Sequence, residues 1–76
     1  MTPVHLARTA AIFKALAHPA RLNIALGLAA RTECNVSTMA RKLALAQPAV
    51  SQHLAVLKNA GVIESARKGT TICYRI

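Results

Sequence analysis

The strongest constraint on the fold lies in residues 47–60, QPAVSQHLAVLKNA, which have the pattern of an amphipathic helix. Val50, Leu54 and Leu57 recur at i, i+4 and i+7, so they share one side of a helix with 3.6 residues per turn. Polar side chains occupy the opposite side, and the stretch contains no carboxylate. The pattern predicts a helix that packs one side on a core and leaves a polar side in solvent.

The N-terminal segment predicts a first helix over residues 3–17. Thr2 can cap this helix, and Pro3 suits its first turn. The apolar residues cover more than one side of the helix. Two explanations stay open: the surplus apolar side belongs to the protein's own small core, or it packs on a second copy of the chain.

His18-Pro19 ends the first helix and begins a second one, which we expect to reach about residue 30. A residue before proline disfavours helical angles, whereas proline itself is favoured in the first turn of a helix. Ile24 and Leu28 widen the apolar side of this predicted helix. The residues expected on its inward side are Leu22, Leu26, Ala29 and Ala30.

Ser37 predicts the N-cap of a third helix. Residues 31–36 before it are either a plain connector or a short extra strand, since apolar and polar residues alternate there. Residues 44–46 form a three-residue turn before the 47–60 helix. A helix, a short turn and a second helix have the spacing of a helix-turn-helix. The predicted buried residues of the third helix are Met39, Ala40 and Leu43.

The hydrophobic period changes after Gly61, which is well placed as a left-handed C-cap. Two β-prone runs, residues 62–67 and 71–76, flank the short segment Lys68-Gly69-Thr70. A glycine in a short loop between two such runs predicts a hairpin. We therefore expect a single domain over residues 1–76, mainly α, with four helices followed by a two-stranded hairpin.

The charge of the chain narrows its function. Ten Lys and Arg residues face two acidic ones in 76 residues, for a net charge of +8. Such an excess favours a polyanionic partner, nucleic acid before an anionic membrane. With two carboxylates and no spacing of a base and a nucleophile, we expect no enzyme. With neither an apolar run of about 18 residues nor a signal peptide, we expect a cytoplasmic protein without a membrane segment.

Three stretches together resemble the ArsR/SmtB type of winged helix-turn-helix repressor, over nearly the whole chain. The resemblance implies a fold of four helices followed by a two-stranded wing. It also implies a sequence-specific transcriptional regulator that binds double-stranded DNA, and we expect it to act as a repressor. The helix 47–60 is then the one that reads the major groove, and the hairpin tip at 67–71 is the wing that contacts flanking DNA. The stretches are ALAHPARLNIAL (15–26), LAQPAVSQHLAVLKNAGVI (45–63) and RKGTTICYRI (67–76).

The resemblance assigns DNA contacts by position. Ser37 and Thr38 match backbone-contact positions at the start of the third helix, where free N–H groups face a phosphate. Gln47, Ser51 and Gln52 match the DNA-reading positions. Glutamine can pair with adenine, and serine can contact a base or a phosphate.

His53 also matches a DNA-reading position, but a half-buried histidine is an equally good interpretation of it. Basic side chains and one hydroxyl surround the proposed reading surface, and we expect phosphate contacts from most of them. These residues are Arg41, Lys42, Lys58, Arg67, Lys68 and Thr70.

The chain departs from the family at the metal sites. Many metal-sensing members carry Cys-x-Cys at the third helix; the matching positions here are Asn35 and Ser37, and Cys34 lies one place off. Other members bind metal on a C-terminal helix, which this short sequence, ending at Ile76, lacks. We therefore expect neither a metal nor another cofactor. The same helix supplies half of the usual dimer interface, so we expect a homodimer that relies on helix 3–17.

Three further expectations follow from the resemblance. It places Cys34 near Cys73, so a redox-sensitive disulfide stands as an alternative to two reduced, apolar side chains. Ala46 replaces the usual capping serine before the 47–60 helix, at a cost of about 1 kcal/mol. The alternative function is a winged-helix interaction module, which binds a protein partner or binds DNA without sequence preference.

Overall fold

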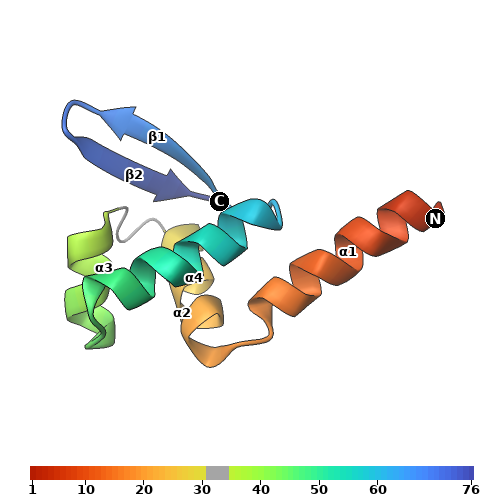
Figure 1. Ribbon diagram of the computed structural model, residues 1–76, viewed down its shortest axis with the longest axis horizontal. Coiled ribbons are helices and arrows are strands. Elements are labelled where there is room, and N and C mark those ends of the chain that lie inside the picture. The colour runs from red at the N-terminus through yellow and green to blue at the C-terminus, as the bar shows by residue number, and fades with distance from the viewer. Residues whose placement is uncertain (31–34) are drawn as a thin grey trace.

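The computed structural model describes residues 1–30 and 35–76, in which four helices are followed by an antiparallel hairpin (Figure 1). The helices α2, α3 and α4 form the body of the molecule, and the hairpin and α1 extend from it (Figure 1). This order of elements confirms the predicted one. The elements are α1 (Pro3–Leu16), α2 (Pro19–Ala29), α3 (Val36–Leu43), α4 (Gln47–Asn59), β1 (Glu64–Lys68) and β2 (Thr71–Arg75).

Side chains just before α1 and α2 explain where these helices begin. The Oγ1 of Thr2 accepts a hydrogen bond from the His5 amide at 3.2 Å. The Nδ1 of His18 accepts one from the Ala20 amide at 3.1 Å, and Pro19 is the first residue of α2. Both bonds satisfy amides that have no partner within the helix. The predicted cap at Thr2 and the predicted break at His18-Pro19 are confirmed.

The predicted cap of α3 is wrong by two residues. Asn35 caps this helix instead of Ser37, because its Oδ1 accepts a hydrogen bond from the Thr38 amide at 2.8 Å. The helix begins at Val36, so this residue does not belong to a strand. The rest of the alternative strand falls at residues 31–34, which lie outside the described residues.

The turn between α3 and α4 lies where the sequence predicted it. Ala44 ends α3 with a φ of 55°, in the left-handed region that normally favours glycine. The Leu45 amide then donates to the Ala40 carbonyl at 3.0 Å, which closes the end of α3. Ala46 precedes α4 in an extended conformation and makes no capping bond with its side chain, as expected for alanine.

The core lies where α2, α3 and α4 meet, and α4 supplies its centre. Val50, Leu54 and Leu57 are almost wholly inaccessible, which confirms the predicted inward side of this helix. Met39 and Ala40 of α3 are buried as predicted, and their neighbour Leu43 packs on the core while half-buried. The other buried members of the cluster are Ala15, Ile24, Leu28 and Ile63.

The predicted inward side of α2 is wrong. Leu22 and Leu26 are 45% and 62% exposed, whereas Ile24, Ala25 and Leu28 are buried. Apolar residues occur all round this helix, so its periodicity does not identify the side that meets α3 and α4. The other two residues expected inward, Ala29 and Ala30, are exposed as well.

Gly61 ends α4 in the left-handed conformation that the sequence predicted, with a φ of 82°. The Gly61 amide donates to the Lys58 carbonyl at 3.0 Å, and the Val62 amide donates to the Leu57 carbonyl at 2.9 Å. These two bonds are those of a Schellman motif, and they satisfy carbonyl groups that the last turn would otherwise leave unpaired.

The hairpin is confirmed, but its first strand begins at residue 64 instead of 62, and its loop is one residue shorter than predicted. Lys68 pairs with Thr71, so Gly69 and Thr70 alone form the turn. Gly69 has a φ of 63°, a value that glycine adopts without steric cost. None of the helices in the described part of the chain is both long and apolar enough to cross a lipid bilayer.

Candidate nucleic-acid interface

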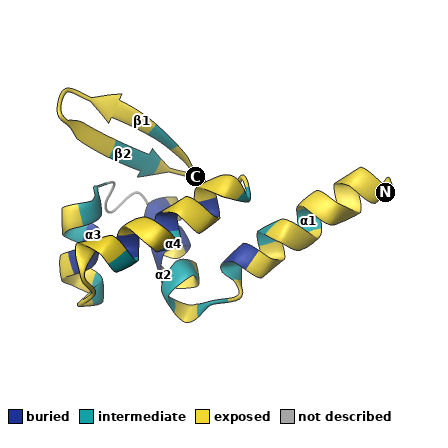
Figure 2. Cartoon of the chain, viewed as in Figure 1, coloured by how far each residue is buried: buried dark blue, intermediate teal, exposed yellow. Residues whose placement is uncertain are grey.

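One long side of α4 is open to solvent. Gln47, Ser51 and Gln52 are exposed, whereas Val50 and Leu54 on the same helix are buried (Figure 2). The buried side holds α4 in place, and the exposed side presents amide and hydroxyl groups without any carboxylate. Such a side can exchange hydrogen bonds with the base edges of a major groove.

The first residues of α3 and α4 lie next to each other. The Nε2 of Gln47 donates a hydrogen bond to the Oγ of Ser37 at 3.3 Å, and both side chains are exposed. Because Asn35 already holds the Thr38 amide, the amides of Val36 and Ser37 are the ones at this helix start that can face a phosphate. The structure thus brings together Ser37, a predicted backbone-contact residue, and Gln47, a predicted reading residue.

Lys58 connects α4 to the hairpin. Its Nζ donates a hydrogen bond to the Oγ of Ser65 at 2.8 Å, between the last turn of α4 and strand β1. The bond is exposed, so its contribution to stability is small. It places the Lys58 charge at the base of the hairpin, near where α4 ends.

The hairpin separates its charges along its length. At the base, the Arg75 Nε lies 2.6 Å from the Glu64 Oε1, and these residues pair in the strand register. At the other end, Arg67 and Lys68 are exposed together with Thr70. The hairpin's one carboxylate is therefore bound at the base, and the tip carries positive charge alone.

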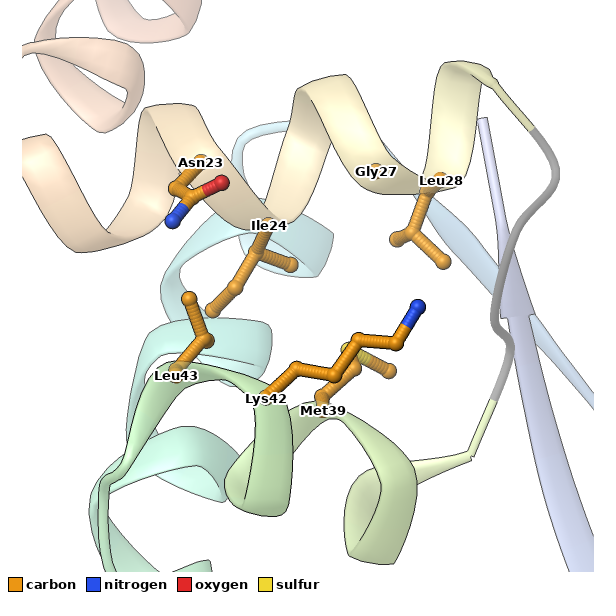
Figure 3. A pocket seen from close by; sticks show the side chains of 7 residues that line it. All are labelled: Asn23, Ile24, Gly27, Leu28, Met39, Lys42 and Leu43. Carbon is orange, nitrogen blue, oxygen red and sulfur yellow. The ribbon is translucent and has the colours of Figure 1, made fainter.

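The two basic residues of α3 have different surroundings. Arg41 is exposed, whereas the Lys42 side chain extends along a cavity of about 140 Å³ between α2 and α3, toward Leu28 (Figure 3). In Figure 3 the Lys42 side chain lies beside Met39, and its ammonium nitrogen points toward Leu28. The other residues that line the cavity are Asn23, Ile24, Gly27, Met39 and Leu43.

His53 is half-buried and its ring faces His18. The two ring centroids are 4.7 Å apart, with 48° between the ring planes. Burial lowers the pKa of His53 below its usual value of 6.5, and the nearby charges of His18 and Arg21 lower it further. The ring therefore lies against the body of the molecule, although its neighbour Gln52 is exposed.

Most of helix α1 is exposed to solvent (Figure 2), and its exposed residues include large apolar side chains. Val4, Leu6 and Phe13 are 59%, 56% and 68% exposed, and Ala15 is the one residue of this helix that is buried. Exposed apolar side chains gathered on one element are typical of a protein–protein contact.

A sequence model of a known family matches residues 18–65, and its description is "Bacterial regulatory protein, arsR family". This chain belongs to the ArsR family. It is 43% identical over 67 residues to the biofilm growth-associated repressor of Agrobacterium fabrum, a match that covers 88% of this chain and 56% of that protein. The chain spans about half the length of the curated relatives it matches.

Solved structures of regulators show the same ArsR-family architecture. The transcriptional repressor PagR of Bacillus anthracis aligns with a TM-score of 0.88 and 35% identity, over 99% of this chain and 85% of that one. The homodimeric winged helix-turn-helix DNA-binding domain of Mb0332 from Mycobacterium bovis aligns with a TM-score of 0.88 and 36% identity. This alignment covers 96% of this chain and 67% of that one. The fold is therefore a winged helix-turn-helix, in which α3 and α4 form the helix-turn-helix and the hairpin is the wing.

Three contacts at this ArsR-family surface were not predicted. They are the bonds Gln47–Ser37 and Lys58–Ser65 and the ring contact His18–His53. Each joins two elements, and residue spacing along one helix carries no information about such a contact. His18 offered one partial signal, since its place before Pro19 marks it as a capping position.

The remaining predicted sites concern sulfur and metal. Cys73 is unpaired and half-buried on β2, and its Sγ lies 3.9 Å from the Tyr74 carbonyl oxygen. Its predicted redox partner, Cys34, lies outside the described residues. Within residues 1–30 and 35–76, no three side chains of His, Cys, Asp or Glu gather in a way that would hold a metal ion.

Proposed function

We propose that this protein is a sequence-specific DNA-binding transcriptional regulator that acts as a repressor, with residues 1–76 as one DNA-binding domain. The observation that carries the proposal is α4, which is anchored by three buried side chains and presents Gln47, Ser51 and Gln52 to solvent. A net charge of +8 supports a polyanionic partner. The names of the relatives support regulation over catalysis, and the proposal places the protein in the cytoplasm with the DNA.

In this proposal, sequence is read by α4 and affinity comes from phosphate contacts around it. Gln47, Ser51 and Gln52 contact base edges, and half-buried His53 supports α4 from behind them. The start of α3, the basic residues of α3 and the wing bind the phosphate backbone of the flanking DNA. The proposed backbone contacts are Ser37, Thr38, Arg41, Lys42, Lys58, Arg67, Lys68 and Thr70.

We further propose that two copies pair through the exposed apolar side of α1. Leu6 and Phe13, which are seven positions apart and share one side of α1, leave water when a second copy covers them. The homodimeric state of the Mb0332 domain supports this arrangement. A two-fold dimer would place two α4 helices roughly 34 Å apart, about one turn of DNA, on a near-palindromic site.

The test begins with selection of bound sites from random duplex DNA at near-physiological salt, which should enrich one inverted repeat. The double variant Ser51→Ala/Gln52→Ala should then bind the selected site more weakly by roughly 1–3 kcal/mol per lost base contact, and should bind random DNA as before. Fluorescence anisotropy on both duplexes measures the difference.

A matched control removes charge from the wing. The variant Arg67→Ala/Lys68→Ala should weaken binding to both duplexes alike and should lower the salt slope by about one unit for each lost phosphate contact. If the selection enriches no sequence and affinity follows only salt and charge, the protein is instead an interaction module without sequence preference.

A further inference from the structure

His18 and His53 meet where the junction of α1 and α2 touches α4. His18 is the N-cap of α2, and His53 lies in the middle of α4 between exposed Gln52 and buried Leu54. Their ring centroids are 4.7 Å apart, and both side chains are half-buried. The pair therefore connects the start of one core helix to the helix proposed to read DNA.

The His18 ring holds its cap only in one protonation state. Its Nδ1 accepts the Ala20 amide hydrogen, so this nitrogen carries no proton of its own. A doubly protonated imidazole has two donors and no acceptor, and it would lose this bond. It would also place a positive charge at the positive end of the α2 dipole. Acid therefore works against the observed position of His18.

The charged surroundings of His53 act in the same direction. From α2, His18 and Arg21 face it, and burial together with these two groups lowers the pKa of His53. On the α1 side, the Arg21 Nε donates a hydrogen bond to the Ala15 carbonyl at 2.6 Å. The cations of α3, Arg41 and Lys42, are exposed.

Among the described residues, no acidic side chain acts on His53 beside His18 and Arg21. The acidic residue of the described chain, Glu64, is bound to Arg75 in the hairpin, and Lys58 of α4 is bound to Ser65. A proton added to His53 therefore enters a site with positive neighbours, and the two rings repel each other once both are charged.

We propose that His18 is a positioning residue that holds α4 through His53, and that protonation of this pair weakens sequence-specific DNA binding. The inference rests on the proposed function, because it assumes that α4 reads DNA. The direction of the pH effect on DNA binding distinguishes a positioning histidine from one that contacts DNA. A histidine that touched DNA directly would strengthen binding to the phosphates when protonated, whereas a positioning histidine weakens binding.

The coupling of the pair is tested first without DNA, by an NMR titration of the histidine rings. His53 should titrate below the ordinary histidine pKa of 6.5. In His18→Asn, the His53 midpoint should move part of the way up, because one positive neighbour is gone while burial remains. Asparagine is a good N-cap, so this variant retains α2 and loses only the titrating ring. A His53 midpoint at or above 6.5 in the wild type, or one that is unchanged in His18→Asn, overturns the proposal.

Stability gives a second readout that needs no DNA. The folded state binds the His53 proton less readily than the unfolded chain does, so the free energy of unfolding should be level above the ordinary pKa of 6.5 and fall as the pH drops below it. His18→Asn and His53→Gln should each reduce this fall, and His5→Gln should leave it unchanged. A fall that persists undiminished in both pair variants overturns the proposal.

The DNA arm compares affinity for the selected site at about pH 7.5 and about pH 5.5, on either side of the ordinary histidine range. The wild type should bind several-fold more weakly in acid, and His18→Asn should hold nearly constant affinity. Equal or tighter binding of the wild type in acid overturns the proposal. Absence of any preferred site at either pH instead contradicts the proposed function, while the two titrations still decide whether the pair is coupled.

Discussion

Helices α1 and α4 both carry spaced apolar side chains, but they bury them to very different extents. The three apolar residues that anchor α4 are almost wholly inaccessible, whereas α1 buries Ala15 and leaves Phe13 68% exposed. In Figure 1, α4 crosses the body of the molecule and α1 extends away from it. The comparison shows that apolar residues indicate how much of a helix surface favours burial. They do not indicate whether the same chain or another molecule covers that surface.

The difference in burial between α1 and α4 is tested most directly by truncating one leucine in each helix. Leu54→Ala should lower the free energy of unfolding by about 2–5 kcal/mol, because it removes a buried side chain and leaves a cavity. Leu6→Ala on α1 should change it by only about 0.5 kcal/mol at concentrations where the protein is monomeric. Urea unfolding followed by circular dichroism measures both. An equal loss for Leu6→Ala would mean that the α1 surface is already covered in a single chain.

A second change tests whether another copy covers α1. Phe13→Ser should weaken self-association by about 2 kcal/mol, or roughly 30-fold in Kd, as for an aromatic residue at the centre of an interface. Sedimentation equilibrium measures this shift, and circular dichroism should show the same helix content. His5→Ser on the same helix is the control and should sediment like the wild type. Identical sedimentation of all three proteins would contradict a dimer through α1.

A third, smaller effect concerns the bond that links the end of α1 to α2 in the body of the molecule. Arg21→Met should cost about 1.5 kcal/mol, because it removes the 2.6 Å bond from the Arg21 Nε to the Ala15 carbonyl and keeps most of the side-chain volume. Hydrogen exchange should quicken in the last turn of α1 and stay unchanged in α4. Arg8→Met, at an exposed position of α1, should leave both rates as they are. Faster exchange along α4 would show that the two helices are not separate in stability.

The sequence predicted the buried side of a helix correctly where the apolar residues lie on one side only. The inward side of α4 was predicted because its apolar residues recur on one side only. The inward side of α2 was wrong because Leu22 and Leu26 are as apolar as Ile24 and Leu28. When every side of a helix is apolar, packing against its neighbours decides which residues become buried.

Helix ends show a similar division over shorter distances. Thr2 and Gly61 were placed correctly because each stands alone as a start or stop signal. Asn35 and Ser37 are both good caps two residues apart, and the choice between them depends on which side chain reaches a free amide. Local preference limited the start of α3 to a few residues, and the path of the backbone selected one.

The order of the helices and the wing, the break at His18-Pro19, the left-handed turn at Gly61 and the anchored side of α4 were all predictable from the sequence. Each of these depends on residues that are close in the chain or on a pattern along one element. The tertiary structure alone decided the buried side of α2, the place of Lys58 beside Ser65 and the pairing of His18 with His53. These features join separate elements, so they exist only once the helices have packed together.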